Sequence, residues 1–264
     1  MVKANNSFVS GSAFRGIVPQ TIPPFGRFCV MDYRYLTPTV GGFLQQLAVC
    51  YVGRGYFFYV QGTIPKNKSP EEVDKNILAK YKIPASKFQR YRRKRWGIAN
   101  LQYLRWENHF IILATHGIHV FFEAEVKRIK DVRREPILFE GYSISYQNGP
   151  KVRLAKETYE NLKSYILGMA VHKQGAYITQ EVRQLPYESY APVRRQLLYI
   201  LTSVNLRRKA AGLPLISYKS IRYRRNIYKP FAPPPPSPPP TFWLDYRWSR
   251  SKERKHRTRK QGSK

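Results

Sequence analysis

The chain has 264 residues, with 47 Lys and Arg against 16 Asp and Glu, so its formal net charge at neutral pH is +31. Hydrophobic residues make up 42% of the sequence, which is enough for a folded core and excludes a wholly disordered chain. No apolar run approaches the ~18–20 residues that a membrane span needs, and a charge this large predicts a polyanionic partner, most commonly DNA or RNA. An anionic membrane surface or an acidic protein is the alternative.

The cysteines and the N-terminus bear on the compartment. Cys29 and Cys50 form neither a disulfide framework nor a CxxC metal motif. The N-terminus has no apolar segment of the kind that secretory signals carry. We therefore expect an intracellular protein of the cytoplasm, nucleoid or nucleus.

The beginning of the chain predicts an arm followed by strands. Residues 1–27 are rich in Gly, Ser, Asn and Pro, which is typical of a flexible arm. Residues 28–35 alternate between apolar and polar side chains and predict a strand. The apolar run 43–52 suits either a strand or a helix, whereas the aromatic and β-branched residues of 56–64 favour a central strand.

A helix and a group of strands are expected next. Ser69, Pro70 and Glu72 have the pattern of a capping box with proline in the first turn. Further along, apolar or alternating stretches predict three strands, at residues 98–105, 109–115 and 118–125. His116 and Gly117 are the expected tight turn before the last of them, because glycine readily adopts positive φ.

The next segment predicts one more strand and two helices. Residues 137–146 alternate again, and Asn148-Gly149 after them is a strong turn signal. Apolar residues at helical spacing then predict helices at about 155–171 and 192–210.

These elements predict an α+β fold with an antiparallel sheet and helices on one face, for which a ferredoxin-like core is suitable. We expect five parts: a flexible arm (1–27), an α+β nucleic-acid-binding core (28–175), a basic helical extension (176–229), a polyproline linker (230–241) and a disordered basic tail (242–264). The linker is also a candidate ligand for a protein partner of the SH3 or WW type.

The clearest functional signal lies in residues 82–96, where Lys and Arg alternate with aromatic residues and no acid occurs. Lys and Arg bind phosphates, and aromatic rings stack on unpaired bases. The alternative is a merely solvated basic loop. We expect nucleic-acid contacts from Lys87, Arg90, Tyr91, Arg92, Arg93, Lys94, Arg95 and Trp96, with Phe88 interleaved among them.

A second basic zone combines the ends of helix 192–210 with the segment 220–225. Alternation in that segment predicts a short basic strand, and a helix followed by such a strand suggests a winged-helix-like element. A helix with solvated basic ends is an equally suitable interpretation. The candidate contacts here are Arg194, Arg195, Arg222, Arg224 and Arg225.

The stretch around residues 100–119 resembles the metal-binding strand of HUH-type rolling-circle replication and transposition proteins. That family has a His-hydrophobic-His motif on a central strand of a ferredoxin-like fold, and a tyrosine on a helix that attacks DNA. His109 matches the first histidine, whereas Ile111 stands in place of the second.

The resemblance implies Tyr159 as the nucleophile, with Lys163 one helical turn later, and Mg²⁺ or Mn²⁺ as the cofactor. It also implies DNA of a mobile element or plasmid as the ligand. His116 and His119 do not replace the missing ligand, because a turn between them would separate them.

A carboxylate cluster is a further possibility for metal chemistry, since acids are scarce in this chain. If residues 118–125 form a strand, Glu123 and Glu125 share one of its faces. Ion pairing with the many arginines explains the acids more simply. The candidates are Asp32, Glu107, Glu123, Glu125 and Asp131.

We expect a DNA- or RNA-binding protein without a cofactor, which binds phosphates and stacks on bases and is not itself an enzyme. The first alternative is an HUH-like tyrosine DNA-nicking enzyme, a replication initiator or transposase. The second is a structural RNA-binding component of a ribonucleoprotein particle.

Overall fold

The computed structural model of the protein describes residues 33–232. The predicted arm, the basic tail and the linker beyond Ala232 lie outside the described residues. Of the strand predicted at 28–35, only residues 33–35 are described, and they do not form a strand. The first pairing is instead a parallel bridge between Leu36 and Arg105.

The first sheet contains β1 (Phe58–Thr63), β2 (Leu101–Trp106), β3 (His109–Ala114) and β4 (Lys130–Asp131). Its strand order is β2-β3-β1-β4, and every neighbouring pair is antiparallel. Helices α2 (Pro70–Lys80) and α3 (Lys87–Arg95) connect β1 to β2, and α4 (Val120–Ala124) connects β3 to β4. This βαββαβ connectivity is that of a ferredoxin-like unit, so the α+β prediction is confirmed.

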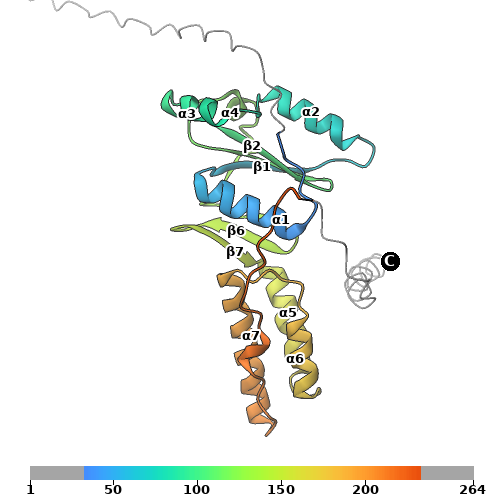
Figure 1. Ribbon diagram of the computed structural model, residues 1–264. Coiled ribbons are helices and arrows are strands. Elements are labelled where there is room, and N and C mark those ends of the chain that lie inside the picture. The colour runs from blue at the N-terminus through green and yellow to red at the C-terminus, as the bar shows by residue number, and fades with distance from the viewer. Residues whose placement is uncertain (1–32, 233–264) are drawn as a thin grey trace, which may run out of the picture. The chain divides into compact units, whose positions relative to one another are not determined.

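Both faces of this sheet are covered, because its central strands are apolar on both sides. On β3, Ile112 and Ala114 lie in a core with α2 and α4, whereas Ile111 and Leu113 face a second, larger core. Figure 1 shows α2, α3 and α4 on one side of β1 and β2 and α1 on the other. The predicted arrangement with helices on one face therefore holds only for the helices inside the βαββαβ unit.

Helix α1 (Val40–Gln45) continues into a π-helix at Gln46–Tyr51 and a 3₁₀ turn at Val52–Arg54. The apolar run 43–52, which suited a strand or a helix, is thus helical. Thr39 begins α1 by accepting a hydrogen bond from the backbone of Gly42 at 3.1 Å.

Residues 118–125 do not form the predicted strand. Their short helix α4 begins at His119, whose Nδ1 accepts a hydrogen bond from the Phe121 backbone at 3.1 Å. Histidine is not among the favoured capping residues, so the sequence pattern does not indicate this helix. The expected hairpin turn at Gly117 leads into α4 instead, and Glu123 and Glu125 do not share a strand face.

The second sheet has the order β5-β6-β7, with β5 (Ile137–Phe139), β6 (Tyr142–Tyr146) and β7 (Pro150–Leu154). The single strand predicted at 137–146 is therefore a hairpin. It turns at Glu140 and Gly141, which both have positive φ, at 43° and 76°. The turn predicted at Asn148-Gly149 is confirmed between β6 and β7.

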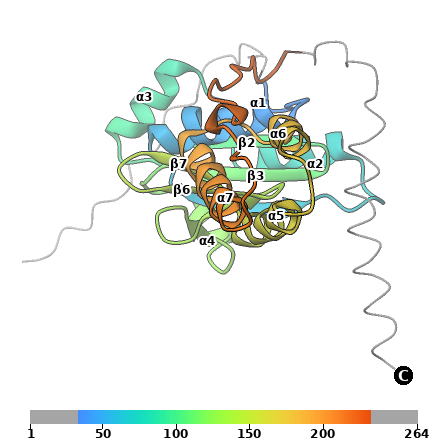
Figure 2. The same ribbon diagram turned by 90° about the horizontal axis from the view of Figure 1, so that it is seen from below.

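Three helices follow: α5 (Lys156–Met169), α6 (Gly175–Arg183) and α7 (Ala191–Ala210). Helices α5 and α7 match their predictions, whereas α6 was not predicted. Ile166, Ile178 and Val204, one from each helix, belong to the larger core that also contains the second sheet. Figure 1 shows the three helices below β6 and β7, and Figure 2 views them from below, nearly end-on.

Two local predictions are wrong. The segment 220–225 forms no strand, so the winged-helix-like element is not present; a 3₁₀ turn at Tyr218–Ser220 precedes an extended segment there. The capping box at the start of α2 is also missing, because the Ser69 hydroxyl donates to the Glu71 carboxylate at 3.1 Å rather than capping the helix.

Candidate nucleic-acid interface

The basic segment 82–96 is a helix rather than a loop over most of its length. Helix α3 begins with a capping box: the Gln89 backbone donates to the Ser86 hydroxyl at 3.2 Å, and the Gln89 side chain accepts from the Ser86 backbone at 2.7 Å. It ends in a Schellman motif, in which Gly97 has a φ of 68° and the Ile98 backbone donates to the Arg93 carbonyl at 2.9 Å. Both ends of the helix are thereby fixed.

The inner side of α3 is attached to the protein by two arginines. Arg90 donates to the carbonyl of Ala85 at 2.7 Å, and its own carbonyl accepts from the Asn100 side chain at 3.0 Å. Arg93 donates to the Lys82 carbonyl at 3.2 Å, and burial lowers the pKa of its guanidinium. Both were predicted to contact nucleic acid, but the structure gives them a role in holding α3 in place.

Solvent-exposed aromatic rings lie on the outer side of α3. Phe88, Tyr91 and Trp96 are 77%, 61% and 58% exposed. Large apolar side chains normally lie inside proteins, and two of these lie on the short helix while the third, Trp96, is its C-cap residue, so they form an exposed apolar patch. Phe88 and Tyr91 are three residues apart, which places them on neighbouring turns of one face.

Cations surround these rings without counter-ions. Six of the nine residues of α3 are Lys or Arg, and none of the ion pairs among residues 33–232 involves an α3 side chain. No Asp or Glu occurs in the sequence between Asp74 and Glu107. The exposed cations are Lys87, Arg92, Lys94 and Arg95. Three of them lie in the last turn, where the partial negative charge of the helix end favours positive side chains.

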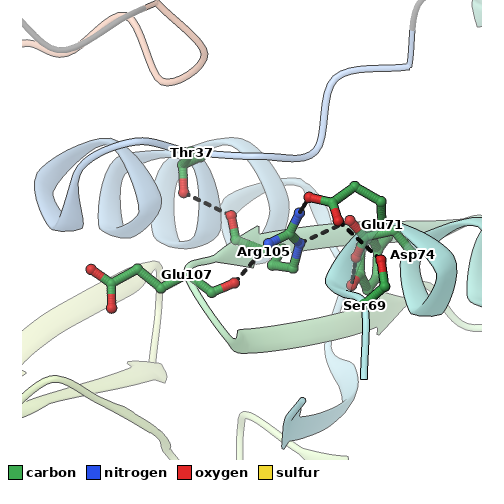
Figure 3. A network of polar contacts seen from close by, with 7 residues as sticks. Thr37, Ser69, Glu71, Asp74, Arg105 and Glu107 are labelled. Atoms are coloured by element: carbon green, nitrogen blue, oxygen red, sulfur yellow. Dashed lines mark hydrogen bonds and ion pairs between the residues drawn. The ribbon is translucent and has the colours of Figure 1, made fainter. Parts of the chain in front are cut away.

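A buried polar network fixes α2, the helix before α3, to the sheet (Figure 3). The Asp74 carboxylate accepts hydrogen bonds from the Tyr103 hydroxyl at 2.5 Å and from Arg105 Nε at 2.8 Å. Arg105 also donates to the Glu107 carbonyl at 2.8 Å, and its own carbonyl accepts from the Thr37 hydroxyl at 3.1 Å. Burial and the nearby carboxylate raise the pKa of Tyr103, so its hydroxyl remains a donor.

The second basic zone is divided between structural and free arginines. Arg194 donates to the carbonyls of Ser189 and Tyr223, at 2.6 and 3.0 Å, and Arg222 donates to the Tyr187 carbonyl at 2.7 Å. These bonds fasten the extended segment after α7 to the body.

Arg225 lies over the ring of Tyr190, with its guanidinium 5.0 Å from the ring centroid. Only Arg195 and Arg224 of the predicted set are exposed and without such contacts in the described part of the chain. The predicted zone therefore mostly holds the chain in place.

The residues implied by the HUH resemblance are not assembled around a metal. The His109 ring is packed between Phe43 and Phe139, with centroids 5.9 and 5.1 Å away, and burial lowers the pKa of the imidazole. Its Nε2 is buried and has no hydrogen-bond partner among residues 33–232. Ile111, at the second ligand position, is fully buried in the core.

Tyr159 is partly buried against the larger core, and the Lys163 ammonium lies 6.0 Å from its ring centroid. Among residues 33–232, no group of three or more His, Cys, Asp or Glu side chains is placed to hold a metal ion.

The carboxylates predicted as a possible cluster have separate roles. Glu125 accepts from the Tyr81 hydroxyl at 2.7 Å and pairs with Arg128 at 3.3 Å. Asp131 pairs with Arg133 at 2.6 Å, and this hydrogen bond is the main reason that the pKa of the carboxyl is lowered. Asp32 lies outside the described residues, and no contact joins Glu107 to Glu123 within the described part.

Comparison of the sequence with protein-family models and with curated proteins finds no match. Within residues 33–232, none of the helices combines the length and the apolar character that crossing a bilayer requires.

Proposed function

We propose that this protein binds single-stranded nucleic acid along the outer side of α3. Lys87, Arg92, Lys94 and Arg95 contact phosphates, and Phe88, Tyr91 and Trp96 stack on bases. The observation that carries the proposal is the coincidence, on one well-capped helix and its C-cap residue, of three exposed aromatic rings with four exposed cations that have no counter-ion among residues 33–232.

The aromatic rings favour a single strand over a duplex. Stacking one unpaired base on an aromatic side chain contributes about 1–3 kcal/mol, and every base has a face that can stack. In a duplex the bases are already stacked on each other, so only the cations of α3 would gain contacts. Two of the exposed cations near the rings, Arg92 and Arg95, are arginines, which can form bidentate hydrogen bonds with phosphate.

The proposal is tested by titrating the full-length protein into labelled single-stranded DNA, duplex DNA and single-stranded RNA of one sequence, followed by fluorescence anisotropy. We expect tighter binding to the single strands than to the duplex at equal salt. We take DNA as the ligand; tighter binding to RNA would select the ribonucleoprotein alternative. Absence of binding to any single strand at low salt would refute the proposal.

An HUH-like DNA-nicking activity is the second candidate. Two observations favour it: the ferredoxin-like strand order, and the place of His109 on β3, between β2 and β1, with an unpartnered Nε2. Incubating single-stranded DNA with Mn²⁺ and either the natural protein or Tyr159→Phe tests it. If the natural protein nicks the DNA and the variant does not, the enzyme activity is established. Equal nicking by the two proteins would exclude Tyr159 as the nucleophile.

A further inference from the structure

A groove of about 500 Å³ lies between β7 and α7, away from the aromatic helix in the sequence. Its volume falls in the ~300–1,000 Å³ range of ligand pockets. Three cations and one aromatic ring line it, and no acidic residue does. Figures 1 and 2 both show β7 beside α7.

Strand β7 supplies two of the cations. Lys151 and Arg153 are two residues apart, so their side chains leave the same face of the strand. Val152 and Leu154 alternate with them and are buried in the core behind. The buried residues thus hold the strand in the one register that places both cations in the groove.

Helix α7 supplies the opposite wall. Arg195 and Tyr199 lie one turn apart and are both exposed, Tyr199 at 62%. Gln196 between them fastens the helix to the strand: its side chain accepts from the Leu154 backbone at 2.8 Å and donates to the Leu154 carbonyl at 3.2 Å. This two-point connection keeps the two walls at a fixed separation.

The cations of the groove have no counter-ion in the described part of the chain. Arg153 and Arg195 take part in no hydrogen bond or ion pair of their side chains with residues 33–232. Lys151 donates only to the Gln147 side chain, at a long 3.4 Å. Like charges held close together repel each other. An anion bound between them would offset this repulsion by attracting each cation.

We infer that this groove is a second binding site for the phosphodiester backbone of a nucleic-acid strand, with Tyr199 stacking on a base. Guanidinium groups on both walls match phosphate oxygens on the two sides of a backbone, and an exposed tyrosine ring beside them matches the neighbouring base. The inference rests on the proposed function, and it extends the contact from α3 to a region that sequence spacing does not connect with it.

The test compares two triple variants in the full-length protein. One is Lys151→Ala/Arg153→Ala/Arg195→Ala; the control is Lys66→Ala/Lys68→Ala/Lys75→Ala, which removes the same charge from exposed positions on other segments. The slope of log affinity against log salt is measured with labelled oligothymidylate. Each phosphate neutralised on a single strand contributes ~0.7 to the steepness of this slope, so the groove variant should make it shallower by about 2.

A control variant that makes the slope equally shallow would overturn the inference, because the effect would then come from net charge alone. Replacing Tyr199 gives an independent readout: Tyr199→Ala should weaken binding about tenfold, whereas Tyr199→Phe should retain it. Equal affinities of these two variants and the natural protein would remove the stacking role.

The outcomes separate the groove from α3. If variants of α3 weaken binding and the groove variant has the same salt slope as its control, the groove inference is wrong and the proposed function stands. If the natural protein binds no single strand, both are wrong. Thermal unfolding checks that the variants are folded, and we expect unchanged midpoints because the replaced side chains are not in the core.

Discussion

Arg105 of β2 and Asp74 of α2 form an ion pair inside the protein, with Nε and Oδ2 2.8 Å apart and side chains 6% and 0% exposed. The Tyr103 hydroxyl donates a hydrogen bond to the other carboxylate oxygen of Asp74, Oδ1. The pair joins the sheet to the helix that precedes α3, and Arg105 donates further to the Glu107 carbonyl. It is a structural connection between the scaffold and the candidate interface.

Replacing Asp74 by Ala should therefore lower the free energy of unfolding by about 3–5 kcal/mol, because Arg105 would remain buried without its counter-ion. Urea denaturation measures the change. Glu71 is the matched control, since it also approaches Arg105, at 3.8 Å, but is 68% exposed. Glu71→Gln should change the free energy of unfolding much less than Asp74→Ala, because solvent screens an exposed ion pair. A larger loss in Glu71→Gln than in Asp74→Ala would contradict the role of the buried pair.

The exposed rings of α3 should contribute more to single-strand than to duplex binding. Phe88→Ala and Trp96→Ala should each weaken single-strand binding by about 1–3 kcal/mol, or roughly 5- to 150-fold. Anisotropy titrations with both substrates measure this difference. Because neither side chain is buried, the unfolding midpoint should not change. Equal losses on single strand and duplex would show that the rings do not stack on bases.

Gly117 should be needed for the position of the α3 end. Its φ is 141°, and a Cβ there would lie 2.6 Å from the Gly97 carbonyl oxygen and the Ala99 nitrogen. The Ile118 backbone donates to that same Gly97 carbonyl at 2.9 Å, just after Trp96. Gly117→Ala should thus destabilise the protein by at least ~1–3 kcal/mol and weaken single-strand binding as well. If this variant unfolds with the same free energy as the natural protein, the close backbone approach at Gly117 is not needed for stability.

The buried imidazole of His109 should make the fold sensitive to acid. Burial lowers the pKa of His109 below its ordinary value of about 6.5, so the folded state binds fewer protons than the unfolded state once the pH falls below that value. Stability should consequently decrease as the pH falls from about 6.5 towards the lowered pKa.

The pKa of His119 is also lowered, by burial and by Arg93 and Lys82, and it contributes in the same direction. His109→Phe replaces the imidazole between Phe43 and Phe139 by a ring that does not titrate. Urea midpoints at a series of pH values should fall less steeply in this variant than in the natural protein. An equally steep profile would mean that His109 does not titrate with unfolding.

The sequence predicted the parts of the fold in which pattern and burial agree. Strands β1, β2 and β3 were found because their apolar runs end at clear turns, and α5 and α7 because their apolar faces are regular. Helix α4 was missed because its first residues are aromatic and β-branched and its cap is a histidine. The β5–β6 hairpin was missed because its turn places Glu140, an unusual residue, at positive φ.

For the candidate site, the sequence pointed to the segment 82–96 but not to the side of the helix on which each residue lies. Arg90 and Arg93 differ from Arg92 and Lys94 only in helical phase, and phase requires knowing which face contacts the sheet. The groove was not predicted, because Arg153 and Arg195 are distant in the sequence and come together through the packing of β7 against α7, including the hydrogen bonds between Gln196 and Leu154.

The central claim is that the outer cations of α3 bind the phosphates of a single strand. The most direct test is the salt dependence of oligothymidylate binding for Lys87→Ala/Arg92→Ala/Lys94→Ala/Arg95→Ala, against a variant with Lys66, Lys68, Lys75 and Lys127 replaced by Ala. Since each neutralised phosphate contributes ~0.7, the α3 variant should make the slope shallower by about 3, and the control should change it little. Slopes that change equally in the two variants would contradict a site on α3.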